Sequence, residues 1–233
     1  MRHWSFLSML RAGCATLVWL TIGCGHGRML PAPGARIIPD APSFAVIERD
    51  GVRLAASGDD WAVPPKDLES VLTPVRVRIV NHSGHSLRLL WGRFTLAGAH
   101  GRVYRPLPPI PLLHEHPRDR VGTVRPYYAP ASFFVRPAYG DVYPSIPPWP
   151  ARLVTDDQFY QHQYALWDGD LPTREMQSRA LPEGVLADGG QISGFLYFEN
   201  ATQREAKLSL QADLRDGDTD VEIASIAIPF RVR

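Results

Sequence analysis

The sequence contains very little cysteine: Cys14 and Cys24 are the only two among its 233 residues. Both lie near the start, so every segment after residue 24 lacks a thiol. A cysteine nucleophile, a thiolate metal site and a disulfide are therefore excluded there. A domain without disulfides depends on its hydrophobic core, and a hydrophobic fraction of 45% is ordinary for a globular protein.

The sequence also lacks the local motifs of common enzymes. It has neither a Gly-x-Ser-x-Gly elbow nor a His-Glu-x-x-His pair, and its glycines sit at turns rather than in a phosphate-binding loop. The adjacent carboxylates Asp59-Asp60 and Asp156-Asp157 would point to opposite faces of a strand instead of converging. We therefore expect no enzymatic activity and no cofactor. A carbohydrate-active enzyme remains an alternative if two carboxylates face each other across a cleft.

Lysine is scarce, since Lys66 and Lys207 are the only two and arginine supplies the remaining positive charge. The chain has 25 basic and 24 acidic side chains, which gives a formal net charge of +1. A chain with such balanced charge has no strong overall field to attract a nucleic acid or an acidic membrane surface. We expect no nucleic-acid partner.

The first 23 residues have the features of an export signal. Arg2 and Arg11 form a basic region, and an apolar run follows over residues 12–23. This run is shorter than the roughly twenty apolar residues needed to span a bilayer. We predict a signal peptide over residues 1–23, with an N-terminal anchor as the alternative.

The apolar run ends in the stretch Leu20-Thr21-Ile22-Gly23-Cys24. It resembles the lipobox of bacterial lipoproteins, in which a small residue precedes a cysteine, although Thr21 stands where leucine is usual. The resemblance implies cleavage before Cys24, lipidation of its thiol, and an exported protein held at a membrane of the cell envelope. The outer membrane is the expected location, on its periplasmic side or at the surface. Cys14 is the rival position. Residues 24–43 are rich in proline and glycine, so we expect a flexible tether there.

The first segments after the tether predict strands. Residues 44–57 carry Asp50-Gly51 between two apolar runs, which is the strongest short-range signal of a hairpin. Residues 74–81 alternate between apolar and polar side chains and predict a further strand. Residues 87–96 predict the next strand, with a bulge where the phase changes at Gly92. A short helix is predicted over residues 173–181, with Thr173 as its N-cap.

The last part of the chain predicts three more strands, over residues 192–198, 207–214 and 221–232. The second of these alternates regularly, as a strand with one face on the core does. The first is apolar on both faces, so it should be central or covered by another segment. The third changes phase, which predicts a bulge near Ala224 and Ser225.

The strand–loop order of these segments resembles a known domain type. The loop Asn81-His82-Ser83, the exit Tyr104-Arg105-Pro106, and the strand that begins Gly194-Phe195 are similar to parts of immunoglobulin-like, telokin-like domains of secreted bacterial lipoproteins. The resemblance covers about residues 44–106 and 181–233. It implies a β-sandwich and assigns no activity. We expect an all-β fold with one immunoglobulin-like β-sandwich domain over residues 44–233, an irregular insertion over about 106–180, and one short helix.

The insertion has an unusual composition. Residues 106–150 contain 12 of the 22 prolines, and residues 104–167 contain 12 of the 23 aromatic residues. Such a segment is too aromatic for ordinary disorder and too rich in proline for regular sheet. We predict that its aromatic side chains form an interaction surface for an envelope protein or polymer; the alternative is that they are only a second core. The predicted surface consists of Tyr127, Tyr128, Phe133, Phe134, Tyr139, Tyr143 and Trp149.

Histidines supply the metal alternative. His82 and His85 flank a tight loop, and His114 and His116 bracket a glutamate. Neutral imidazoles bind zinc and copper, but no spacing here matches a known ligand motif. The sequence therefore leaves a binding module of the envelope as the first hypothesis and a His-dependent zinc- or copper-binding lipoprotein as the second.

Overall fold

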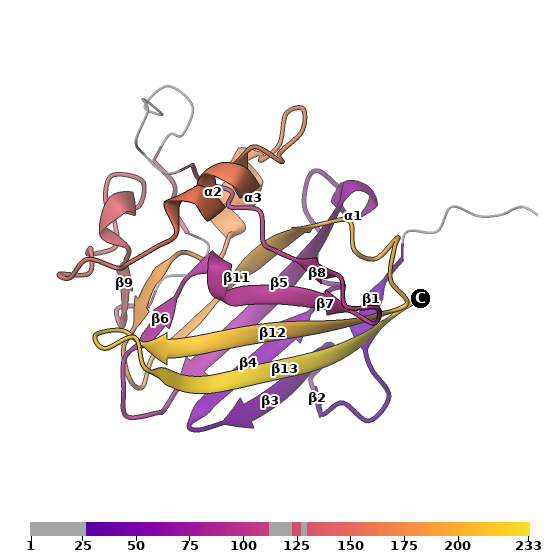
Figure 1. Ribbon diagram of the computed structural model, residues 1–233, viewed down its shortest axis with the longest axis horizontal. Coiled ribbons are helices and arrows are strands. Elements are labelled where there is room, and N and C mark those ends of the chain that lie inside the picture. The colour runs from indigo at the N-terminus through magenta and orange to yellow at the C-terminus, as the bar shows by residue number, and fades with distance from the viewer. Residues whose placement is uncertain (1–26, 112–122, 127–129) are drawn as a thin grey trace, which may run out of the picture.

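Two antiparallel sheets packed face to face form the framework of the protein in the computed structural model (Figure 1). The structure describes residues 27–111, 123–126 and 130–233. The predicted lipidation site Cys24, the predicted ligands His114 and His116, and the predicted surface residues Tyr127 and Tyr128 lie outside the described residues.

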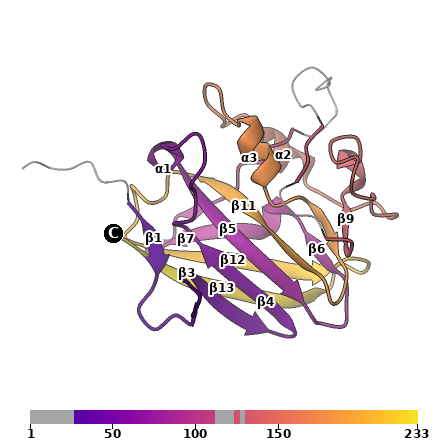
Figure 2. The same cartoon turned by 180° about the vertical axis from the view of Figure 1, so that it is seen from behind.

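Within these described ranges, the larger sheet has eight strands: β1 (Met29–Pro31), β6 (Leu87–Leu89), β7 (Phe94–Gly98), β8 (Val103–Tyr104), β9 (Phe133–Val135), β10 (Gly184–Leu186), β12 (Lys207–Asp216) and β13 (Glu222–Val232). The other has five: β2 (Ile37–Ile38), β3 (Ala41–Arg49), β4 (Val52–Ser57), β5 (Leu72–Asn81) and β11 (Gln191–Glu199) (Figure 2). The helical segments of the described residues are α1 (Leu68–Val71), α2 (Asp157–Tyr164), α3 (Arg174–Arg179) and two 3-10 turns, η1 (Trp91–Arg93) and η3 (Pro137–Tyr139).

The two inner faces form one hydrophobic core. The alternating positions of β12 place Leu208, Leu210 and Leu214 in it, as the period-two pattern predicts. Val77 and Ile79 of β5 face them from the other sheet and are fully buried. The predicted sandwich architecture is therefore confirmed at the level of two packed antiparallel sheets.

The predicted hairpin is also confirmed. β3 and β4 pair in antiparallel register and are joined by Asp50 and Gly51, whose φ angles are 50° and 76°. Two successive residues with positive φ are what a type I′ turn requires, and its twist matches that of the flanking strands. The predicted irregularity in the last strand is confirmed as well, because the register of β12 against β13 shifts beside Ala224.

Three expectations from the sequence are wrong. Residues 29–43 are not a tether: they form β1, β2 and the start of β3, and Met29 is fully buried because its side chain enters the core. Residues 87–96 are not one bulged strand, because η1 separates β6 from β7. The fold also has more than one short helix: α3 begins after Thr173 as predicted, but α2 begins after Asp156, whose side chain accepts a hydrogen bond from the amide of Phe159.

β11 illustrates why a strand that is apolar on both faces need not be central. It lies at the edge of the five-stranded sheet. Its outer face is covered, since Trp61 and Trp167 contact the ring of Tyr197, and the Tyr197 hydroxyl donates to the carbonyl of Met176 in α3. The carbonyls of this strand also accept hydrogen bonds from the amides of Leu107 and Leu181. The strand is therefore covered by other segments and is not central, which is one of the two arrangements that its sequence predicts.

Candidate functional site

The larger sheet divides into two branches at η1. β12 pairs with β7 over residues 208–212 and with β6 only at Arg215 and Asp216. β8 extends the branch that contains β7, while β10 and β9 extend the branch that contains β6. At this division the ring of Phe159, in the helix α2 that the insertion supplies, lies against Gly92 of η1.

Glu183 occupies this division in the sheet. Its side chain has no exposed surface, and its Oε1 accepts a hydrogen bond of 2.7 Å from the amide of Trp91 in η1. The same oxygen accepts a hydrogen bond from the hydroxyl of Tyr160, and Oε2 accepts one of 3.2 Å from the guanidinium of Arg136. The carboxylate thus satisfies a backbone donor that has left the regular sheet.

Arg136 joins this carboxylate to the insertion. One of its terminal nitrogens donates to Oγ1 of Thr155 at 2.7 Å, and its backbone amide donates to the carbonyl of Glu183. Its guanidinium carbon lies 5.4 and 5.1 Å from the ring centroids of Tyr139 and Tyr160. The buried charge pair is therefore hydrogen-bonded and flanked by aromatic rings.

The pKa values of these groups are shifted by burial and by each other. Burial raises the pKa of the Glu183 carboxyl above its ordinary value, and the donors Arg136, Tyr160 and Trp91 only partly offset that effect. Burial lowers the pKa of Arg136, but the charge of Glu183, the neighbouring Tyr139 and Tyr160 and the hydrogen bond to Glu183 together outweigh it, so the net pKa is raised. Burial, followed by the Glu183 charge, raises the pKa of Tyr143, so its phenol stays neutral at physiological pH.

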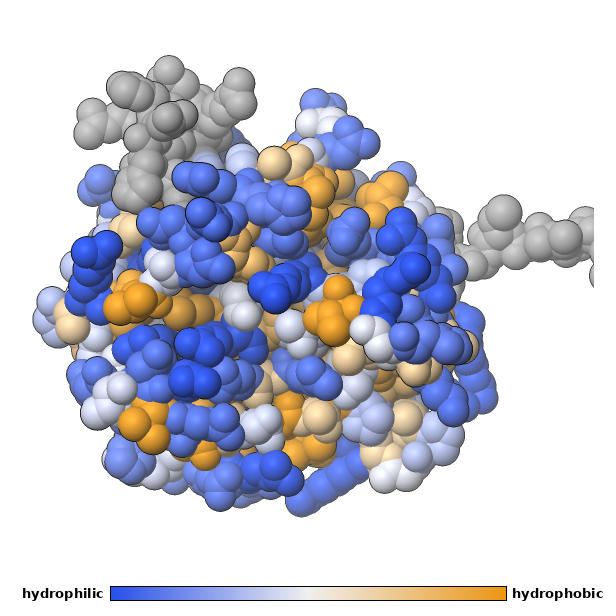
Figure 3. Space-filling model, viewed as in Figure 1, coloured by the Kyte–Doolittle hydropathy of each residue, from blue (hydrophilic) through white to orange (hydrophobic). Residues whose placement is uncertain are grey.

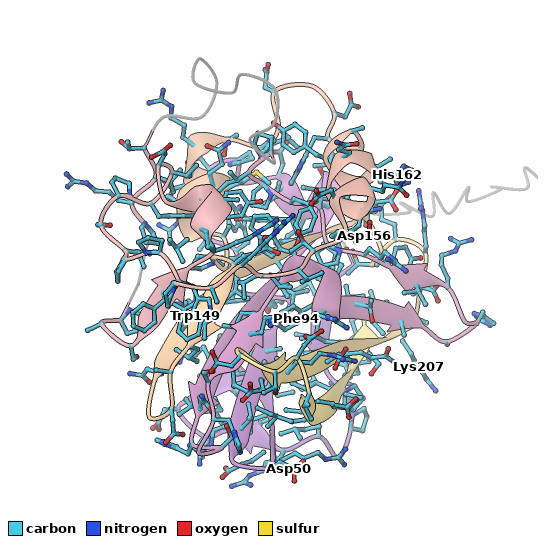
Figure 4. The ribbon with its side chains drawn as sticks, turned by 60° about the vertical axis from the view of Figure 1, so that its left-hand side comes forward. Asp50, Phe94, Trp149, Asp156, His162 and Lys207 are labelled. Atoms are coloured by element: carbon cyan, nitrogen blue, oxygen red, sulfur yellow. The ribbon has the colours of Figure 1, made fainter. Side chains whose placement is uncertain are left out.

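A cleft of about 160 Å³ lies beside this network. The residues that line it include Gly92 and Arg93 of η1, Arg105 after β8, and Thr155, Asp156 and Tyr160 around the start of α2. Figure 4 shows Asp156 at the start of α2, with Phe94 at the start of β7. Tyr160 therefore has two roles: its ring lines the cleft and its hydroxyl reaches the buried carboxylate.

The two arginines of the cleft differ in their surroundings. Arg93 donates to Asp213 at 2.9 Å, and a second carboxylate, that of Asp220, lies 3.7 Å away. Arg105 is exposed and lies over the ring of Phe159, with its guanidinium carbon 5.9 Å from the ring centroid. No carboxylate of the described residues forms an ion pair with Arg105. The cleft therefore offers one cation to an incoming acidic group.

The cleft gives little support to acid–base catalysis. Among the residues that line it, Asp156 alone carries a carboxylate, and this carboxylate already caps α2. Glu183 lies behind Tyr160 with no exposed side-chain surface. Two carboxylates facing each other across this cleft, which a glycosidase would need, are therefore not present among its lining residues.

A wider groove, of about 350 Å³, lies on the outer face of the five-stranded sheet. Its two arginines already make surface contacts, because Arg53 pairs with Glu48 at 2.9 Å and Arg78 lies over the ring of Phe44 at 4.5 Å. This groove has no buried polar network behind it among the described residues. We therefore regard the cleft between η1 and α2 as the better candidate.

Three of the five described residues of the predicted aromatic surface belong to the core. Phe133 and Tyr139 have no exposed surface, and Tyr143 is only 1% exposed, so the prediction that they form an interaction surface is wrong. The second core, which the sequence left as an alternative, describes these three correctly, because the insertion folds back onto the sheets instead of presenting its rings. Phe134 and Trp149 are half-buried and form an edge-to-face pair with centroids 5.5 Å apart.

The two described histidines of the predicted metal site are exposed to solvent. His82 and His85 are both exposed in the loop between β5 and β6, and Nδ1 of His85 lies 3.4 Å from a carboxylate oxygen of Asp216. Within the described ranges, no three or more His, Cys, Asp or Glu side chains are grouped so that they could hold a metal ion. Metal binding by the four histidines stays a prediction.

Sequence reasoning missed the residues of the cleft and its network. No sequence pattern distinguishes Arg136, Tyr160 or Glu183 as a site residue, and Arg105 belongs only to a loop pattern. One signal was available: Glu183 is the one charged residue in the otherwise apolar or small run over residues 181–186. A carboxylate in such a run is buried only when it is paired.

Comparison of the chain with protein-family models, with curated proteins and with solved structures found no match. None of the helices in the described part of the chain has the length and apolar character needed to cross a membrane. The functional argument therefore depends on the geometry of the cleft and on the N-terminal sequence.

Proposed function

We propose that this protein is a non-enzymatic, lipid-anchored binding module of the cell envelope, and that its cleft between η1 and α2 receives an acidic group of a partner. The observation that carries the proposal is Arg105, an exposed cation at the cleft without a carboxylate partner among the described residues. An acidic group placed there would gain a charge-assisted hydrogen bond.

The buried network supports this proposal because it fixes the wall of the cleft. Tyr160 is held through its hydroxyl by Glu183, and Thr155 is held through Oγ1 by Arg136. A preorganised wall loses less conformational entropy when a partner binds. The groups that could otherwise act as acids or bases are engaged in holding the structure, which favours binding over catalysis.

The lipid anchor and the location are the other parts of the proposal. They are supported by the lipobox-like stretch that ends at Cys24. The resemblance to immunoglobulin-like lipoprotein domains is also kept as part of the proposal, and two packed antiparallel sheets support it at the level of architecture.

Site-specific photo-crosslinking in intact membranes tests the binding site. Val154 lines the cleft and is 75% exposed, so a photoreactive residue can replace it without disturbing the core. Val221, which is 63% exposed beside the β12–β13 turn and does not line the cleft, is the matched control position. We expect an adduct of defined mass from position 154, its loss when Arg105→Glu is added, and no such adduct from position 221.

Two outcomes would overturn the assignment of the cleft. One is equal crosslinking from both positions, and the other is an adduct that Arg105→Glu leaves unchanged. The anchor is tested separately by mass spectrometry of the purified protein. An acylated N-terminal peptide that begins at Cys24 is expected, and an unmodified Cys24 within a longer N-terminal peptide would contradict the anchor.

A further inference from the structure

The chain becomes part of the folded domain very soon after Cys24. Arg28 and Arg233 exchange backbone hydrogen bonds of 2.7 and 3.0 Å, which fixes the first described residues beside the last strand. A Cβ added to Gly27 would lie 2.7 Å from the carbonyl oxygen of Thr202, so the backbone is closely packed even at this position.

This geometry limits how far the domain can be from a membrane. If Cys24 carries a lipid, which is the part of the proposed function on which this inference rests, three residue steps separate Cys24 from Gly27. Three steps of extended chain span at most about 11 Å. The end of the sandwich that contains Arg28 and Arg233 would then have to lie at the bilayer surface.

That end of the sandwich carries a cluster of cations. Lys207 and Arg231 are cross-strand partners on β12 and β13, and the carbonyl of Arg102 accepts from Gly98, which pairs with the residue after Lys207. Arg204 belongs to the loop that packs against Gly27. We call this surface the basic end; it comprises the half-buried Arg231 and five exposed cations, Arg28, Arg102, Arg204, Lys207 and Arg233.

Fewer acids face these cations. Glu199 and Asp67 are exposed, the latter in the turn before Ser70, whereas Asp59 is half-buried and already bonded to Arg28. Glu69 is half-buried and its charge also acts on Arg28. The side chain of Glu205 is only 5% exposed and accepts a hydrogen bond from the hydroxyl of Tyr104. The exposed charge at this end is therefore mainly positive.

We infer that the basic end binds the anionic headgroups of the membrane to which the chain is anchored. The net charge of the whole chain is close to zero, but the charges are distributed unevenly, so this surface can be positive in a nearly neutral protein. Figure 3 shows a largely hydrophilic surface where the N-terminal trace leaves the domain, as a headgroup-facing surface should be. Cations close to an anionic bilayer each strengthen binding several-fold.

Vesicle binding by the full chain bearing Cys24→Ser tests this inference, because the lipid then makes no contribution. Binding is measured to vesicles of phosphatidylcholine alone and to vesicles that also contain phosphatidylglycerol. We expect tighter binding to the anionic vesicles, a loss of roughly tenfold in that difference with Arg204→Gln/Lys207→Gln, and a weaker difference at high salt. Residues 1–23 are present in every sample, so their contribution is the same in all the variants that are compared, and the comparison of variants decides the test.

The matched control is Arg152→Gln/Arg174→Gln, which removes the same number of exposed cations from the insertion. Equal binding to both kinds of vesicle would overturn the inference, and so would an equal loss in the control variant. An unmodified Cys24 in the wild-type chain would contradict the lipid anchor. This measurement does not depend on the vesicle assay, so the anchor and the headgroup binding can be rejected separately.

Discussion

The hydroxyl of Tyr160 donates a hydrogen bond to Oε1 of Glu183, so one side chain connects the wall of the cleft to a carboxylate in the interior. Glu183 uses the same oxygen to accept the amide of Trp91. The position of α2 over the divided sheet therefore depends on a polar contact as well as on apolar packing.

Removing this contact should destabilise the protein. Tyr160→Phe deletes the donor and leaves a buried carboxylate less well satisfied, so we expect the free energy of unfolding to fall by about 1–3 kcal/mol. Urea denaturation measures the change. Tyr143→Phe is the control, because the Tyr143 hydroxyl is buried without a partner in the described part of the chain and its loss should cost less than about 0.5 kcal/mol. Equal costs in the two variants would contradict this role of the Tyr160 hydroxyl.

Arg136 and Glu183 should be energetically coupled. Either Arg136→Met or Glu183→Leu leaves an uncompensated buried charge, with an expected cost of about 3–5 kcal/mol. The double variant removes both charges and should be less destabilised than the sum of the single variants. A double-mutant cycle measured by urea denaturation gives the coupling energy, and strictly additive costs would show that the pair does not act as a unit.

The stability contributed by Glu183 should depend on pH. Burial raises the pKa of its carboxyl in the folded protein above the ordinary value of 4.5, so the folded state binds this proton more tightly than the unfolded chain. The contribution is then fully present below pH 4.5 and is lost as the pH rises through the folded pKa. We expect the unfolding free energy of the wild type minus that of Glu183→Gln to decrease over this range, as followed by urea titrations from pH 4 upward. A difference that grows with pH would mean that Arg136 lowers the pKa below 4.5.

Gly51 should tolerate substitution less well than another glycine of similar conformation. Gly51 has a φ of 76°, and an added Cβ would collide with the carbonyl of His82. Gly34 has a φ of 83° but nothing within 4 Å of an added Cβ. Gly34→Ala should cost about 1 kcal/mol from backbone strain alone, and Gly51→Ala should cost more. Thermal unfolding of both variants checks this, and similar melting temperatures would contradict the clash at Gly51.

The parts of the fold that the sequence predicts correctly are those that depend on patterns of neighbouring residues. The alternation over residues 207–214 predicts β12, and Asp50-Gly51 predicts the β3–β4 turn, because each signal lies within a few residues. The edge position of β11 could not be predicted. Whether an apolar face is covered by a second sheet or by Trp61 and Trp167 depends on distant parts of the chain.

The candidate site is less predictable for the same reason. Glu183 receives its donors from η1, from the segment after β9 and from α2, which are separated from it by 92, 47 and 23 residues. The aromatic content of the insertion is unusual, but composition alone does not determine whether an aromatic side chain is buried or exposed. The burial of Tyr139 and Tyr143 follows from the return of the insertion to the divided sheet.

The covered edge of β11 has a consequence for copies of this chain at high local concentration. Leu107 and Leu181 already donate their amides to the carbonyls of Tyr197 and Phe195, so a neighbouring copy cannot add a strand at these positions. Copies that drift against one another along this side should therefore separate again instead of stacking into fibres.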